Sequence, residues 1–174
     1  MTTNLQSTRY FQHRFPKVEQ YLHHRAPYLL VESISEISRD RIETEAVVGT
    51  ETFYSAGHFP GAPVLPGALM QEVTTQSAGI LIAAEYNPME SFDTSDPGVN
   101  EFALGVLVRV NHAKYRGFAR PGDRLKVIVE LTDQLANCFE FRGRVLKGET
   151  AIMDNGFQLA NILSSTLVGE NGEG

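Results

Sequence analysis

The sequence predicts an α+β domain in which an antiparallel sheet wraps around one long buried helix. Two observations carry this prediction. Segment 66–86 has apolar and small residues at helical spacing and few charges, which is typical of a helix buried on most of its surface. Four β-rich runs with turn signals between them follow this segment, which favours consecutive antiparallel strands.

The chain before the long helix predicts one short helix and two strands. Residues 1–15 are mostly polar, and we expect a flexible N-terminal segment there. Proline at position 16 suits the start of a short helix over 16–22. A strand is predicted over 28–37, where the alternation is irregular, and a second over 41–48. The second strand alternates more clearly, with one face made of Ile42, Thr44, Ala46 and Val48.

The long helix contains one residue that does not suit a buried surface. Pro66 is well placed in a first helical turn, and apolar residues then recur at helical spacing as far as Ala84. Glu72 lies near the start of this helix. Burying a carboxylate costs free energy unless the group is paired or has a chemical task. Glu72 is therefore a candidate functional residue.

The rest of the chain predicts a loop, four strands and a disordered tail. Residues 87–100 are polar and contain Pro88, Pro97 and Gly98, so this segment is interpreted as a loop or a lid. The four β-rich runs cover 102–116, 123–131, 138–146 and 150–163. We expect a single domain over 16–165 and a disordered tail over 166–174.

Composition excludes several classes of protein. The chain has 174 residues, 42% of them hydrophobic, and a formal net charge of −6, which argues against a nucleic-acid-binding protein. The sequence contains neither an apolar run of the roughly 20 residues that a membrane span needs nor a signal-peptide pattern. Cys138 is the single cysteine, so we expect a cytoplasmic location. The histidines lack zinc-ligand spacing, and the glycines do not form a phosphate loop, so neither a metal nor a nucleotide is expected.

His58 and Glu72 together indicate proton-transfer chemistry. Histidine and glutamate are side chains well suited to moving protons near neutral pH. The segment between them is rich in proline and glycine, and it leads directly into the long helix that carries Glu72. Prolines restrict the backbone conformations of this segment, so it is able to hold a defined geometry.

Three blocks of the sequence share a pattern with a known family. They are Leu22-His23-His24-Arg25-Ala26-Pro27-Tyr28-Leu29-Leu30-Val31-Glu32, Gly57-His58-Phe59-Pro60-Gly61-Ala62-Pro63-Val64-Leu65-Pro66-Gly67 continuing to Glu72 and Gln76, and Ala113-Lys114-Tyr115-Arg116 followed by Arg120-Pro121-Gly122-Asp123. These blocks resemble the β-hydroxyacyl-acyl-carrier-protein dehydratases of fatty acid synthesis, which have the hot-dog fold. The resemblance covers roughly residues 22–163. It departs from the family pattern at His23, where proline is usual, and at Ala26, where an aromatic residue is frequent. Glutamate at position 72 is similar to the branch that dehydrates without isomerising.

The resemblance implies a reaction and a set of site residues. The family removes water from a (3R)-3-hydroxyacyl thioester to give the trans-2-enoyl thioester. His58 would take the α-proton, and Glu72 would protonate the leaving hydroxyl. The backbone N–H of Gly67 would bind the thioester oxygen, the carbonyl of Val64 would orient the His58 ring, and Gln76 would hold the Glu72 carboxylate. Gln76 is alternatively an ordinary polar residue of the helix.

The resemblance also implies partners. The substrate would arrive on the phosphopantetheine arm of acyl carrier protein, so no further cofactor is expected. Each site would be shared between two chains of a homodimer, which in this family can assemble into a trimer of dimers. Four basic residues, Lys114, Arg116, Arg120 and Arg124, are candidates for docking the carrier protein. The alternative is that they form an ordinary solvated face.

The same residues allow two alternative functions. A hot-dog thioesterase hydrolyses similar thioesters, although the spacing of His58 and Glu72 argues against it. A non-catalytic acyl-binding subunit is the third possibility. Of the residues in the first block, we expect His23 and His24 to point apart, and Arg25 to pair with a carboxylate near the strand. Neither the acyl chain length nor the pathway follows from the sequence.

Overall fold

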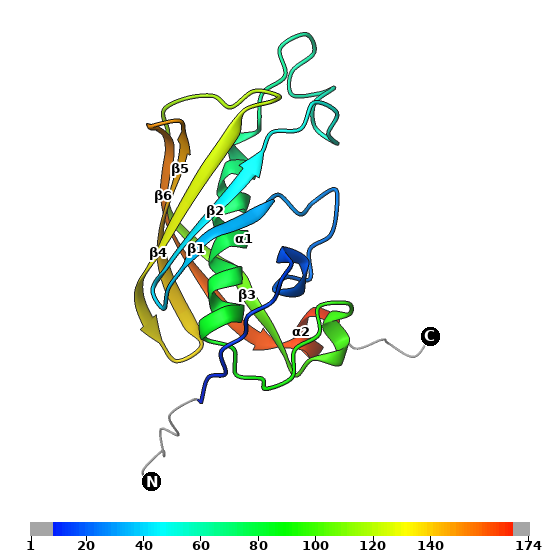
Figure 1. The fold of residues 1–174 in the computed structure, drawn as a ribbon, viewed down its shortest axis with the longest axis vertical. Helices are drawn as coiled ribbons and strands as arrows, with labels where there is room; N and C mark the ends of the chain where they lie inside the picture. The colour runs from blue at the N-terminus through cyan, green and yellow to red at the C-terminus, as the bar shows by residue number, and fades with distance from the viewer. Residues whose placement is uncertain (1–8, 169–174) are drawn as a thin grey trace.

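The computed structural model describes residues 9–168, which form a six-stranded antiparallel sheet and one long helix (Figure 1). The strand order is β1-β2-β4-β5-β6-β3. The helices are η1 (Val18–Gln20), α1 (Gly67–Glu85), η2 (Pro97–Val99) and α2 (Ser164–Val168), and the strands are β1 (Ser33–Ile37), β2 (Arg41–Val47), β3 (Phe102–Tyr115), β4 (Arg124–Leu135), β5 (Cys138–Lys147) and β6 (Thr150–Leu163). None of these helices is long and apolar enough to cross a membrane.

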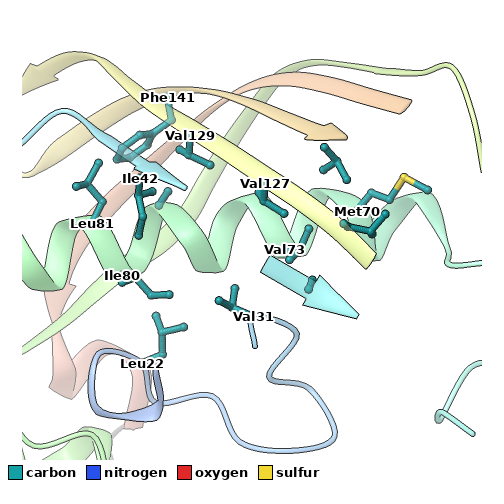
Figure 2. Close-up of a cluster of buried hydrophobic side chains, with 14 of the residues drawn as sticks. Leu22, Val31, Ile42, Met70, Val73, Ile80, Leu81, Val127, Val129 and Phe141 are labelled. Atoms are coloured by element: carbon teal, nitrogen blue, oxygen red, sulfur yellow. The ribbon is translucent and has the colours of Figure 1, made fainter. Parts of the chain in front are cut away.

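Helix α1 lies along one face of the curved sheet and contacts β2, β3, β4, β5 and β6 (Figure 1). Figure 2 shows Val127 and Val129 of β4 on the sheet side of the helix. On another side of the helix, Ile80 points toward Leu22 and Val31, which belong to the chain before β1. The helix is therefore covered by the sheet and by the N-terminal part of the chain, and the predicted arrangement of an antiparallel sheet around one long helix is confirmed.

The predicted elements agree with the structure except at some ends. Helix α1 begins at Gly67, with Pro66 as its N-cap residue, and the short helix predicted over 16–22 is the three-residue η1. The strand predicted over 28–37 is wrong in its first half, because β1 starts only at Ser33. In that half the Leu30 amide donates a hydrogen bond to the Gln76 side chain. A helix side chain thus takes the place of a neighbouring strand.

Strand β3 crosses α1 at a very short distance. Gly105 has a φ of 68°, a conformation that glycine adopts readily. A Cβ atom at Gly105 would lie 3.0 Å from the Cα atom of Gly79 in the helix. Two glycines therefore allow the backbones of β3 and α1 to approach, and this contact places the start of β3 beside the second half of the helix.

Residues 9–15, which belong to the segment expected to be flexible, lie against the C-terminal end of α1. Phe11 forms an antiparallel bridge with Asn87. Glu85, the last residue of the helix, is almost fully buried, and its carboxylate accepts hydrogen bonds from Gln12 and from the guanidinium of Arg14. The predictions for residues 1–8 and 169–174 fall outside the described residues. Helix α2 occupies the start of the predicted tail.

Replacing Leu81 with alanine should lower the free energy of unfolding by about 2–5 kcal/mol, because a buried leucine loses its transfer free energy and leaves a cavity. Leu81 is fully buried among the helix and sheet side chains shown in Figure 2. Leu135, which is 78% exposed at the end of β4, provides the control. Its replacement by alanine should change stability by less than about 0.5 kcal/mol in chemical denaturation. Equal losses in the two variants would contradict the core assignment.

Candidate active site

Glu72 lies in an apolar groove of about 400 Å³ beside the first half of α1. One wall is β3, which contributes residues 103–107, and the opposite wall is the chain before β1, which contributes His24 and Tyr28. Phe92 from the 87–100 segment and Leu167 from α2 also line the groove. A carboxyl group in the lining of an apolar groove suits a substrate that has a polar reacting end and a hydrocarbon chain.

Gln76 holds the Glu72 carboxyl group in place. Its Nε2 donates a hydrogen bond of 2.9 Å to Oε1 of Glu72 and another of 2.8 Å to the carbonyl oxygen of Tyr28. Its Oε1 accepts a bond of 2.8 Å from the amide of Leu30. The Gln76 side chain is only 1% exposed, and these three bonds leave it a single orientation. The contact predicted between Gln76 and Glu72 is present.

Burial raises the pKa of the Glu72 carboxyl group, and hydrogen bonds from Gln76 and Tyr28 lower it by a smaller amount. Glu85, at the other end of the same helix, is also buried but has the guanidinium of Arg14 beside it. The only basic group in contact with Glu72 among residues 9–168 is the imidazole of His24. Glu85 therefore has a permanent countercharge. The surroundings of Glu72 instead favour the protonated form of its carboxyl group.

His58 lies in the loop before α1, and that loop fixes its ring. Nδ1 of His58 is 3.1 Å from the carbonyl oxygen of Val64, and the Val64 amide donates back to the carbonyl of His58 at 2.9 Å. A carbonyl oxygen only accepts, so Nδ1 carries the ring proton in this contact and Nε2 keeps its lone pair. The ring also stacks on Phe59, with 4.1 Å between the centroids. This geometry leaves Nε2 able to act as a base.

Gly67 begins helix α1, and its backbone N–H has no hydrogen-bond acceptor within residues 9–168. The free amide lies at the positive end of the helix dipole, where a developing negative charge is stabilised. A Cβ atom at this position would come within 3.1 Å of the Tyr115 ring. Glycine therefore keeps the start of the helix close to Tyr115 of β3.

The model of the FabA-like domain family matches residues 22–155 of the chain, which lie inside the domain predicted over 16–165. The chain belongs to the FabA-like domain family. This confirms the resemblance on which the predicted fold and enzyme class depend.

Curated relatives of this FabA-like chain carry the name of the predicted enzyme. The chain is 33% identical over 130 residues to the 3-hydroxyacyl-[acyl-carrier-protein] dehydratase FabZ of Thiobacillus denitrificans, covering 74% of this chain and 83% of the relative. It is 32% identical over 133 residues to the FabZ of Verminephrobacter eiseniae, covering 76% and 83%. Dehydratases of this name are therefore relatives over most of the chain.

Solved structures confirm the fold of the FabA-like chain. The dehydratase heterocomplex ApeI:P of Xenorhabdus doucetiae is similar with a TM-score of 0.71 at 20% identity, over 92% of this chain and 100% of that chain. A hypothetical thioesterase of Streptococcus pneumoniae is similar with a TM-score of 0.53 at 11% identity, over 75% and 88%. At these identities the likeness concerns the fold alone.

The single FabA-like chain does not bring all the predicted site residues together. Val64 contacts His58, and Gln76 contacts Glu72, but His58 does not line the groove that contains Glu72. Two groove residues were not singled out from the sequence. These are His24, whose Nε2 lies 3.5 Å from Oε1 of Glu72, and Tyr28, whose ring stacks on that of His24.

Within residues 9–168, Arg25 does not pair with a carboxylate, contrary to the expectation. Its guanidinium donates to the carbonyl oxygens of Glu19, Leu22 and His24 and to Thr94 in the 87–100 segment. Carbonyl oxygens of a turning chain accept from the two terminal nitrogens of the guanidinium in place of a carboxylate. Arg25 therefore connects the segment that carries His24 and Tyr28 to the loop that carries Phe92.

The four basic residues proposed for docking differ in their surroundings. Arg116 forms an ion pair with Asp154, and Arg124 is 3.2 Å from Glu32 and 3.1 Å from Glu45. Lys114 and Arg120 are exposed and have no ion pair within residues 9–168. Arg120 instead lies over the Phe118 ring, 5.8 Å from its centroid. Lys114 and Arg120 are therefore the two cations of the group available to an acidic partner.

The raised pKa of Glu72 predicts a pH-dependent effect of Glu72→Gln on stability. The pKa of the Glu72 carboxyl group is higher in the folded state than in the unfolded state. Ionisation of this group therefore destabilises the folded state, and the effect grows as the pH rises from the pKa in the unfolded state to the pKa in the folded state. The variant lacks this ionisation, so its melting temperature should exceed that of the wild type at pH 8 and match it near pH 4. The exposed Glu149→Gln is the control, and thermal unfolding followed by circular dichroism measures both. A constant difference between pH 4 and pH 8 would contradict the shift.

Proposed function

We propose that the chain is a 3-hydroxyacyl-acyl-carrier-protein dehydratase that acts in fatty acid or related acyl-chain synthesis. The observation that carries this proposal is Glu72, a carboxyl group with a raised pKa held by Gln76 at the edge of an apolar groove. The family and the names of the curated relatives support the same reaction. A free cysteine, Cys138, is in line with the cytoplasm as its location.

The proposed reaction divides two proton transfers between His58 and Glu72. Nε2 of His58 takes the α-proton of the thioester, and the electrons of that C–H bond form the new C=C bond. The C–O bond at C3 breaks with its electron pair on oxygen, and Glu72 supplies the proton that makes the leaving group water. Negative charge that develops on the thioester oxygen is stabilised by the backbone N–H of Gly67. No redox change occurs, so the site needs no electron carrier.

We further propose that each site is shared between two copies of the chain. The residues proposed as base and acid do not meet within one chain, so a complete site requires a second copy. Strand β3 lies at the edge of the sheet, and the exposed side chains on it include Leu107, Val108 and Val110. A long apolar edge strand is suited to pairing with another chain. Pairing in a homodimer would place the partner's His58 beside Glu72, and such dimers could assemble further into trimers.

The proposal is tested by offering the purified protein a (3R)-3-hydroxybutyryl thioester on pantetheine and on acyl carrier protein. We expect ultraviolet absorbance of the enoyl thioester to appear without release of free thiol. The reverse reaction, hydration of the crotonyl thioester, should consume that absorbance. A folded dimer that leaves both thioesters unchanged would contradict the proposal.

The same assay separates the alternatives. A thioesterase would release thiol from the acyl thioester and form no enoyl product. A non-catalytic acyl-binding subunit would retain the acyl thioester without converting it. The structural likeness to thioesterases is at the level of the fold, so it does not favour the first alternative.

If the basic residues dock the carrier protein, Arg120→Glu should raise the KM for carrier-protein substrates more than Arg124→Glu does. Arg120→Glu should raise the KM for acyl carrier protein substrates several-fold at low salt, because Arg120 is exposed and forms no ion pair with any residue from 9 to 168. KM for the small pantetheine substrate should stay unchanged. Arg124→Glu is the matched control, since Arg124 is already paired with Glu32 and Glu45. If Arg120→Glu leaves the carrier-protein KM at the wild-type value, the basic group is only a solvated face.

A further inference from the structure

The two adjacent histidines of the first sequence block face different surroundings. Nε2 of His24 lies 3.5 Å from Oε1 of Glu72, and the His24 ring is stacked on that of Tyr28 with 5.9 Å between centroids. Nδ1 of His23 lies 3.2 Å from the carbonyl oxygen of Thr94, and its ring meets Phe92 edge-on. Only one of the two imidazoles is therefore in contact with the carboxyl group.

The position of the ring proton of His24 follows from its second nitrogen. Nδ1 of His24 is buried and has no hydrogen-bond partner within residues 9–168. A proton on Nδ1 would be a buried donor without an acceptor, which is costly, whereas a bare Nδ1 is less so. The neutral ring therefore carries its proton on Nε2, which faces Glu72. Burial lowers the pKa of His24, and the charges of His23 and Arg25 lower it further, so the neutral form is favoured.

Two donors then lie beside the same oxygen of the carboxyl group. Nε2 of Gln76 donates to Oε1 of Glu72 at 2.9 Å, and Nε2 of His24 lies 3.5 Å from the same atom. At 3.5 Å the second contact is longer than a good hydrogen bond and acts mainly through the N–H dipole. An oxygen that faces two donors is a poor place for an acidic proton, so Oε2 is the oxygen left to carry it.

We propose that His24 is a positioning residue for Glu72, whose neutral imidazole presents Nε2–H to Oε1 and so keeps the acidic proton of Glu72 on Oε2. The inference rests on the proposed function, because the proton on Oε2 is the one delivered to the leaving hydroxyl. It explains why the proton donated to the leaving hydroxyl is carried by Oε2 and not by Oε1.

Few other charged or titratable groups act on this pair. The segment of His24 contributes His23, Arg25 and Tyr28, and the helix contributes Glu72 itself. Strand β3 and helix α2 present only uncharged side chains to the groove. Asp93 and Asp96 of the 87–100 segment act on His23. Tyr28, which stacks on His24, also donates a hydrogen bond to Glu72, so a titration change on mutation of His24 is assigned to the contact between His24 and Glu72 only if it persists when Tyr28 is replaced by phenylalanine.

The test compares His24→Leu, which removes the donor, with His24→Gln, which retains one. The carbon-13 resonance of the Glu72 carboxyl group, assigned with Glu72→Gln, is titrated in each protein. We expect His24→Leu to raise the midpoint by about half a pH unit or more, because loss of a donor favours the neutral acid. In the dehydration assay it should lower kcat about tenfold with little change in KM, because the acid is misplaced. His24→Gln should restore most of both.

His23→Gln is the matched control and should leave the Glu72 titration at the wild-type value. In the wild type, long-range proton–nitrogen spectra should show His24 as the neutral Nε2–H form at pH 7, a measurement that needs no folded variant of His24. A protonated ring or an Nδ1–H ring would overturn the proposal, and so would an unchanged Glu72 midpoint in a folded His24→Leu. A shifted midpoint in a protein without dehydratase activity would instead support the contact and overturn the proposed function.

Discussion

Replacing His58 with alanine, or Glu72 with glutamine, is expected to lower the dehydration rate by about 10²–10⁴-fold in each case, the usual contribution of a positioned acid or base. Alanine removes the ring whose Nε2 is left free by the contact between Nδ1 and Val64. Glutamine keeps the size and an oxygen that accepts from Gln76, but its amide is not an acid and cannot protonate the leaving hydroxyl. The measurement is the initial rate of enoyl thioester formation, compared at equal concentrations of folded protein.

The control for these two variants is the exposed Glu149→Gln, which should retain the wild-type rate. Melting temperatures close to or above that of the wild type would exclude unfolding as the cause of a loss. A Glu72→Gln protein that keeps more than about a tenth of the activity would remove Glu72 from the role of general acid.

Mixing the two inactive variants is expected to restore activity if each site is shared between two chains. A His58→Ala chain still offers Glu72, and a Glu72→Gln chain still offers His58, so a mixed dimer contains one site without either mutation. After unfolding and refolding an equimolar mixture, random association would regenerate about a quarter of the wild-type sites. The measurement is the dehydration rate of the refolded mixture against each variant treated in the same way.

The double variant, with both replacements in one chain, serves as the control for this mixing experiment. Mixed with wild-type chains it forms dimers in which both sites carry one defect, so it should lower the activity of the mixture. If the single variants fail to rescue each other although mixed dimers are present, His58 and Glu72 of the same chain would have to meet.

The fold was predictable because its signals are local. The alternation of Ile42, Thr44 and Ala46 marks the buried face of β2, and all three are buried as expected. The apolar spacing of 66–86 likewise predicts α1 to within one residue at each end. Strand β1 was predicted less well, since Leu30 bonds to a helix side chain 46 residues away, which no local pattern indicates.

The candidate site was predictable only in part, for the same reason. His58 and Val64 are six residues apart in one loop, and Glu72 and Gln76 are one helical turn apart, so both contacts follow from local spacing. The contact between His24 and Glu72 joins residues 48 positions apart. The sequence does not indicate whether His23 or His24 faces the Glu72 carboxyl group. The choice depends on how the chain before β1 packs on α1.

The burial of Glu85 beneath Gln12 and Arg14 limits how far the chain can be shortened. A truncated protein that began at residue 16, the predicted start of the domain, would retain every strand and α1 but would remove both partners of the Glu85 carboxylate. An unpaired buried charge is strongly destabilising. We therefore expect such a truncated protein to be less stable than the full chain, because it loses the residues that pair with the last residue of the central helix.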